Sequence, residues 1–507
     1  MKVVRLITAL AGGLVLGALR FQVFDRGEAS AEAQAILDLA EGLTVEYRAD
    51  VLFRLMDAGK GPGNKDRPAV LEALFQSAVH AKEPVAVHSI APGTPTHAGL
   101  LVEASRLGLD RTSIRCRIVR ELAKTDREKA RRLFREVYRD LGLVASGCES
   151  PLVFDPSLLE ITLREMLVGL KGEALAEQLS DYANSIVSGV QVPGLVQLLL
   201  NHLPAGGDHG LLFAVSSILS GRLQELRDGD RTFVQAVGYL RLIERVAELA
   251  GHLRQGGLGD EMLWRSLRRY LKAHLTAERC ADTVQPGRLE WRSPAEIRAL
   301  FNDSLKAADS RTEPLTEQET RPSRLVTVSP PKQYYLDQAA DCVRALSRLH
   351  EEDPSGERRS EWISTLDRCF SAVRTLVPAS KREETEIFHQ KAAYYVNIFD
   401  MAPAWWDPRA GLEEWLALLE NSPLKTESPM EWLWELQIFL NLARELSEER
   451  RAEFERLQKK GVRIPGLPGP HRQAIWERVR GSKEPVVALY GMLEAVAPLK
   501  WGAWRAR

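Results

Sequence analysis

The chain has 507 residues, of which 45% are hydrophobic and 27% are charged, so most of it is expected to fold. Its 68 lysines and arginines almost balance 69 aspartates and glutamates, so nothing in the overall charge calls for a polyanionic partner. The chain is too long to fold around one ordinary hydrophobic core. At roughly 100–200 residues per domain, its length predicts two to four domains.

The first residues have the pattern of an export signal. Lys2 and Arg5 precede an uncharged apolar run over residues 6–19, which is typical of a secretory signal peptide and shorter than a membrane span. Charged residues over 20–28 separate this run from small residues that could be cleaved. Residues 1–31 are therefore a cleaved signal peptide, an uncleaved signal-anchor or an ordinary buried helix. We expect a protein that is exported, periplasmic or extracellular, or tethered to the membrane by its N-terminus.

Helical periodicity begins with residues 32–42 and 45–58 and is clearest between residues 126 and 143. Six apolar residues there recur with the spacing of one helix face, and we expect them in a core: Ala130, Leu133, Phe134, Val137, Tyr138 and Leu141. Asp126 stands where the N-cap of this helix is expected. The preceding segment, 114–122, repeats the pattern, so the two are expected to form an antiparallel helical hairpin.

The same spacing predicts helices along the rest of the chain. They are expected near 67–81, 97–107, 155–170, 172–187, 191–202, 209–224, 230–254, 259–276, 294–307, 333–350, 359–376, 381–399, 410–420, 429–446, 447–460, 471–480 and 484–496. Strand-like alternation is nearly absent. The predicted fold class is all-α, an irregular α-solenoid or multi-helical array of antiparallel helix hairpins.

Weak internal similarity supports stacked helix pairs. The apolar positions of residues 36–55 recur, with a drifting offset, over residues 101–122. The run KARRLF, from Lys129 to Phe134, resembles the second helix of tetratricopeptide-like repeats, although the full repeat signature is missing. The resemblance implies an architecture of stacked helix pairs and no particular activity.

Composition suggests where the chain divides. Residues 308–332 are rich in Pro, Ser, Thr and Glu and predict a linker or long surface loop. The expected division is 1–31 as the export segment, 32–307 as an N-terminal helical-repeat region, 308–332 as the linker, 333–460 as a second helical region, and 461–507 as a Pro/Gly-rich connection with C-terminal helices.

No compact catalytic, metal or nucleotide motif is present. Glu386 and His389 form a single ExxH, whereas di-metal helical bundles need two, so we predict an amphipathic helix with a partly exposed histidine. The glycine-rich run 59–65 lacks the Gly-Lys-Ser/Thr of a phosphate loop. Basic residues over 111–139 alternate with acidic ones, which is typical of an ion-paired solvated face. No cofactor, metal or nucleic-acid partner is predicted, and the catalytic residues of any enzyme remain unknown.

Cys342 and Cys369 are the best local candidates among the five cysteines for a pairing. Each lies on the apolar stripe of its helix, at similar distances from a turn near Pro354 and Ser355, so they should face each other in an antiparallel pair. They are expected either to form a disulfide or to be two buried thiols in the core.

Trp405 and Trp406 lie in a proline-flanked loop. Exposed tryptophans can form a surface-binding platform for a sugar or a protein partner, and the alternative is a loop tucked onto the helical core.

Three functions remain compatible with these features. The first is a non-enzymatic extracytoplasmic scaffold that binds a protein or peptide partner on a helical surface. The second is an α/α-toroid carbohydrate-active enzyme that uses a carboxylate pair. The third is a structural envelope protein tethered by its N-terminal segment.

Overall fold

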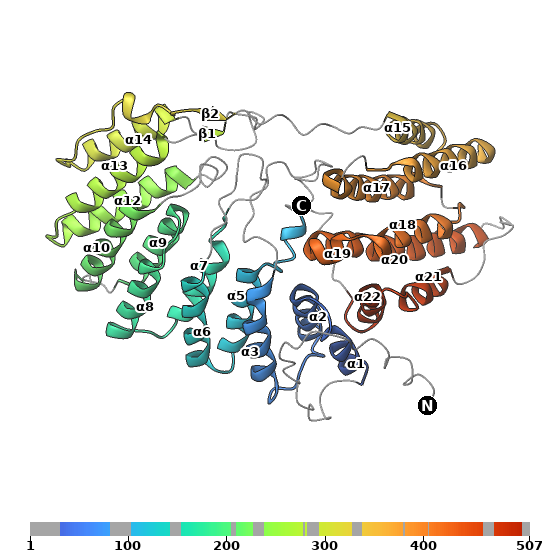
Figure 1. Cartoon of the computed structure of the whole chain (residues 1–507), viewed down its shortest axis with the longest axis horizontal. Coiled ribbons are helices and arrows are strands. Elements are labelled where there is room, and N and C mark those ends of the chain that lie inside the picture. Colours follow the sequence, from blue (N-terminus) through green and yellow to red (C-terminus); the bar gives the residue numbers. More distant parts are fainter. Residues whose placement is uncertain are drawn as a thin grey trace.

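The structure is a computed structural model. It describes residues 31–81, 103–141, 154–203, 209–226, 238–276, 279–280, 294–326, 337–378, 381–403, 405–459 and 471–498. These residues form an all-α array, as predicted (Figure 1). The strands in this part of the chain are β1 (Arg279–Cys280) and β2 (Leu325–Val326), which pair in parallel.

The helices that follow residue 66 build one arm of the array. They are α3 (Arg67–Ser77), α5 (Arg111–Ala123), α6 (Arg127–Arg139), α7 (Ser157–Leu167), α8 (Gly172–Asn184), α9 (Val192–His202), α10 (His209–Glu225), α12 (Gly238–Gln255), α13 (Glu261–Leu275) and α14 (Pro294–Ala307), with 3-10 turns η1 (Ala78–His80), η2 (Gly189–Gln191) and η3 (Gln318–Thr320). Helices close in sequence pack together along this arm: α5 contacts α6 and α7, and α7 contacts α9. This pattern is typical of stacked helix pairs.

The helices after residue 336 build the second arm. They are α15 (Asp337–Glu352), α16 (Arg359–Thr375), α17 (Lys381–Met401), α18 (Arg409–Asn421), α19 (Leu424–Glu427), α20 (Pro429–Lys459), α21 (His471–Arg480) and α22 (Pro485–Val496). The predicted break between residues 446 and 447 is wrong, because α20 continues through it. No Gly or Pro follows Pro429 within this helix, so nothing in its sequence forces a stop.

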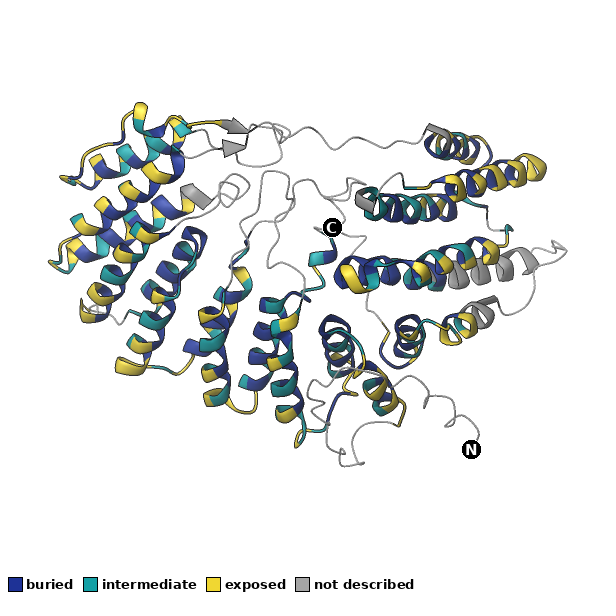
Figure 2. Ribbon diagram, in the orientation of Figure 1, coloured by how far each residue is buried: buried dark blue, intermediate teal, exposed yellow. Residues whose placement is uncertain are grey.

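The predicted hairpin at residues 114–143 is confirmed as α5 and α6. The Asp126 carboxylate accepts a hydrogen bond from the backbone N–H of Lys129 at 3.0 Å, as an N-cap does. The apolar stripe is buried from Ala130 to Tyr138, and Leu141 just beyond the helix is half-buried. Figure 2 shows the same division in the other helices, with buried residues on the faces that meet neighbouring helices.

The first two helices, α1 (Ala31–Ala40) and α2 (Val45–Asp57), join the two arms in the middle of the arc (Figure 1). α1 packs on α22, while α2 contacts α3 on one side and α20 and α22 on the other. The order of helices in space therefore differs from the order in the chain. It runs from α14 down to α3, through α2 and α1, and then from α22 back to α15.

Buried polar contacts hold this junction. The Tyr490 hydroxyl donates a hydrogen bond to the Asp50 carboxylate at 2.8 Å, and Arg54 forms a buried ion pair with Glu494. The Tyr47 hydroxyl donates to the backbone carbonyl of Lys425 at 2.8 Å. Burial raises the pKa of both Asp50 and Tyr490. Residues more than 400 positions apart thus share one core.

Residues 308–326, which belong to the expected linker, lie against α13. The Glu261 carboxylate accepts a hydrogen bond from the Thr312 hydroxyl at 2.9 Å. Arg268 donates to both carboxylate oxygens of Glu319, at 3.0 and 2.9 Å. The hydrogen bond from a neighbouring lysine and the charge of Arg268 lower the pKa of Glu319 to about 2. The division of the chain into domains stays a prediction.

The predicted export segment, residues 1–31, lies outside the described residues except for Ala31. Within the described ranges, no helix has both the length and the apolar character needed to cross a membrane. Export and tethering remain predictions.

Candidate binding cleft between α17 and α18

A cleft of about 530 Å³ lies between α17 and α18, where the end of α16 and the start of α19 also reach it. Its volume is in the range of ligand pockets. One stripe of α17 and one stripe of α18 face each other across it, because lining residues recur every three or four positions on both helices. Its apolar lining includes Ile387, Phe388, Ala417, Leu418 and Leu424.

One pair of charges in the cleft is neutralised. Arg374 and Glu414 form a two-point ion pair, with Nε of Arg374 at 3.0 Å from a Glu414 carboxylate oxygen. Burial, together with the negative charge of Glu414, raises the pKa of the neighbouring Tyr395 hydroxyl, so this phenol stays protonated at neutral pH. These three groups hold α16, α17 and α18 together along one wall.

Two further charges in the cleft are unpaired. Lys391 and Glu384 are half-buried, and neither forms an ion pair or hydrogen bond with another described residue. Burial lowers the pKa of Lys391. The two residues are seven positions apart on one face of α17, about 10 Å along the helix axis. The cleft therefore presents a positive and a negative group, separated along an apolar floor.

His389 lies in the core beside this cleft, between α17 and α20. Its Nδ1 is 2.8 Å from a carboxylate oxygen of Glu435, and its Nε2 is 2.9 Å from one of Glu431. Burial alone would lower the pKa of His389, but the hydrogen bonds and charges of the two glutamates outweigh it and raise the pKa to about 9. At neutral pH the ring is a buried imidazolium that joins the two helices.

The predicted environment of His389 was wrong in one respect, because the ring is 1% exposed and not partly exposed. Its partners come from α20, not from its own ExxH motif, in which Glu386 instead accepts a hydrogen bond from Gln390. The missed signal was two glutamates four residues apart on the Trp- and Leu-rich start of α20. No His, Cys, Asp and Glu side chains of the described ranges are grouped to hold a metal ion.

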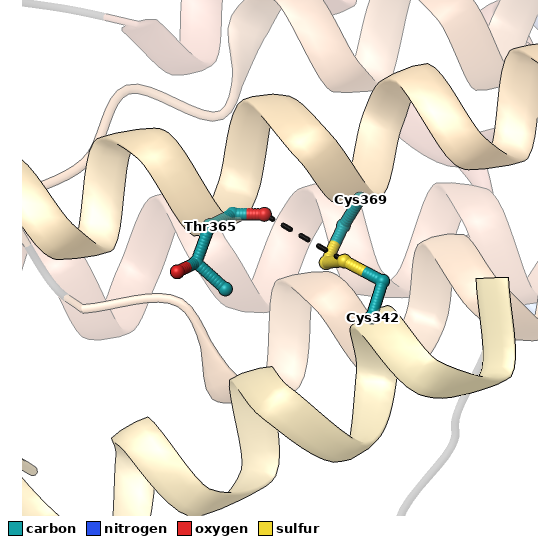
Figure 3. The surroundings of a disulfide bond; sticks show 3 residues. All are labelled: Cys342, Thr365 and Cys369. Carbon is teal, nitrogen blue, oxygen red and sulfur yellow. Dashed lines mark hydrogen bonds between the residues drawn. A yellow bond between two sulfur atoms is a disulfide. The ribbon is translucent and has the colours of Figure 1, made fainter. Parts of the chain in front are cut away.

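The structure brings Cys342 of α15 and Cys369 of α16 together in a disulfide, with Cα atoms 5.4 Å apart (Figure 3). The carbonyl oxygen of Thr365 lies 3.7 Å from the Cys342 sulfur. Cys116, by contrast, is a free cysteine in the core. Burial raises the pKa of its thiol to about 12. Its thiol is therefore inert at neutral pH.

Trp405 and Trp406 lie against the core and do not line the α17–α18 cleft. The Trp405 indole N–H donates to the carbonyl of Gly356 at 2.8 Å, and the Arg359 guanidinium lies 5.3 Å from its ring centre. Trp406 stacks on Phe370 with ring centres 5.6 Å apart. This arrangement matches the tucked loop, one of the two alternatives, better than an exposed platform.

The basic segment 111–139 lines a second cleft, of about 540 Å³, between α5 and α7. Arg117 and Arg120 in this cleft are ion-paired, unlike Lys391. Arg117 bonds Asp57 at 2.7 Å, and Arg120 bonds Glu165 at 2.8 Å. The ion pairing predicted from the alternating signs is confirmed at these positions.

Comparisons of the chain with protein-family models, with curated proteins and with solved structures find no match. The resemblance to tetratricopeptide-like repeats therefore rests on the short motif at Lys129 and on stacked helix pairs alone.

Proposed function

We propose that the protein is an extracytoplasmic helical scaffold that binds a protein or peptide partner. The observation that carries this proposal is the α17–α18 cleft, which combines an apolar floor with two unpaired charges of opposite sign. Clefts between packed helices are common binding sites for amphipathic ligands and peptide segments.

The packing of the array supports a binding role. Buried contacts at the junction, such as the Arg54–Glu494 ion pair, tie the two arms to one core. A surface held in place in this way loses little conformational entropy when a partner binds, which favours affinity.

Two features support an extracytoplasmic location. One is the basic and apolar pattern of residues 1–19. The other is the geometry of Cys342 and Cys369, which are positioned to form a bond that persists in oxidising compartments.

The enzyme alternative has less support. A glycosidase of the toroid type needs two carboxylates facing each other across a pocket, roughly 5–10 Å apart. Asp407, the acidic residue next to Trp406, is ion-paired with Arg409, and Glu414 in the cleft is ion-paired with Arg374. Each of these two carboxylates is therefore already engaged by an arginine. The third alternative, a tethered envelope protein, differs from the scaffold chiefly in that residues 1–31 are retained as an anchor and not cleaved.

Mild crosslinking in the native host, followed by purification and native mass spectrometry, tests the scaffold. We expect a complex of fixed stoichiometry that is heavier than the 56.7 kDa chain. A chain recovered only as a monomer would contradict the proposal. The mass of the mature chain separates the alternatives for the N-terminus, because a start at Glu32 or Ile36 excludes an N-terminal anchor.

A further inference from the structure

We propose that the α17–α18 cleft binds the C-terminal tail of a partner protein, with the terminal carboxylate at Lys391 and a basic side chain at Glu384. This inference rests on the proposed scaffold function and names the chemistry of its partner. It is based on a cleft in which two opposite charges have no ion-pair or hydrogen-bond partner among the residues that the structure describes.

The positive end of the cleft fits a carboxylate. Lys391 is half-buried, and no described acidic residue neutralises it. Arg374 and Glu414, which also line the cleft, are already satisfied by their own two-point contact. A desolvated ammonium without a partner gains most from a ligand that brings a negative charge, because charge-assisted hydrogen bonds strengthen in a partly dry site.

The floor fits an apolar chain end. Ile387 and Phe388 are each about 5% exposed or less, and Leu418 and Leu424 continue the apolar surface from the opposite wall. A polar or charged final residue would lose hydration there without a matching hydrogen bond. The final residues of the bound tail are therefore expected to be aliphatic or aromatic.

Glu384, at the negative end of the cleft, determines which position of the bound tail carries the basic residue. Glu384 lies about 10 Å from Lys391 along the helix, which an extended chain of about three residues spans. A lysine or arginine about three positions before the end of the tail would meet Glu384 while the carboxylate meets Lys391. An acidic residue at that position would be repelled.

The test uses the full-length protein and fluorescein-labelled hexapeptides from a library that varies the last three residues among apolar ones, with lysine or glutamate directly before them. Fluorescence polarisation is expected to find saturable binding by free-acid peptides with the lysine. Amidation of the C-terminus should weaken binding about 10-fold or more, which corresponds to losing one charge-assisted contact. Replacing the lysine by glutamate should weaken it by a similar factor.

Variants assign the two ends. Lys391→Met should bind the free acid and the amide equally weakly, and Glu384→Gln should lose the preference for lysine over glutamate. Lys171→Met, a change of an exposed lysine at the start of α8, serves as the control and should behave as the wild type. Circular dichroism of each variant verifies that the helical fold is retained.

Three results would overturn the inference. The first is that no peptide of the library shows saturable binding up to about 1 mM, roughly the weak limit of useful affinity. The second is that the wild type binds the free acid and the amide equally well. The third is that Lys391→Met still prefers the free acid over the amide as strongly as the wild type does. If crosslinking in the host yields a complex while the peptides fail, the scaffold proposal stands and the tail-binding site is rejected.

Discussion

The junction of the two arms and the α17–α18 cleft differ in whether their charged side chains are paired. At the junction, the side chains of Arg54 and Glu494 are only 10% and 7% exposed and are paired with each other. In the cleft, Lys391 and Glu384 are half-buried and form no ion pair or hydrogen bond with another described residue. An unpaired charge is costly in a core but tolerable at a surface, so the first arrangement serves stability and the second leaves charges available to a partner.

The largest effect is expected from breaking the junction. Arg54→Ala removes this ion pair from the Glu494 side chain, for which Arg444 at 3.8 Å is one of the remaining contacts. We expect the free energy of unfolding to fall by about 3–5 kcal/mol, as when one partner of a buried ion pair is removed. Urea unfolding followed by circular dichroism measures the loss. Arg344→Ala, which removes an exposed ion pair with Asp341, is the control and should cost at most about 1 kcal/mol. Equal losses in the two variants would refute the distinction.

The buried imidazolium of His389 predicts that the protein loses stability as the pH rises. Because the pKa of His389 is raised to about 9, its contribution is complete below the unfolded pKa, near 6.5, and is lost as the pH rises through about 9. The difference in pKa corresponds to about 3 kcal/mol. Urea midpoints between pH 6 and 10 should fall more steeply for the wild type than for His389→Gln. Parallel curves for the two proteins would contradict this assignment.

The disulfide between α15 and α16 is expected to stabilise the second arm. The Cys342–Cys369 bond joins residues 27 positions apart, and its loss is expected to cost about 3 kcal/mol through the added entropy of the unfolded chain. Reductant should lower the urea midpoint of the wild type and leave a Cys342→Ser/Cys369→Ser double variant unchanged. Non-reducing peptide mass spectrometry of protein from the host provides a second test. Free thiols at both positions would contradict the bond and weaken the case for export.

The smallest effect on stability is expected in the cleft. Lys391→Met removes no ion pair or hydrogen bond with a described residue and keeps an unbranched apolar side chain, so the free energy of unfolding should change by no more than about 0.5 kcal/mol. Binding of the lysine-containing free-acid peptides should nevertheless fall. A large loss of stability in this variant would show that Lys391 belongs with the junction residues, as a structural group.

Local signals in the sequence predicted most of the described helices, although not the continuity of α20, and they did not predict the contacts between distant helices. The Asp126 cap and the stripe that follows it lie within one segment, and Cys342 and Cys369 are related by a single turn. Tyr47 and Lys425, by contrast, are 378 residues apart, and no local pattern indicates that they meet. The cleft charges share one helix face, but their lack of partners depends on α16 and α18. His389 was misjudged for the same reason, since its two carboxylates lie 42 and 46 residues away.

The central position of α1 and α2 has a consequence for synthesis on the ribosome. These helices are translated before all the others described, yet Asp50 meets Tyr490 only after 440 further residues have been made. At about 5–20 residues per second, that interval is roughly 20–90 s. During it the apolar faces of α1 and α2 that later meet α20 and α22 have no native cover, and a chaperone that binds nascent chains would find its target there.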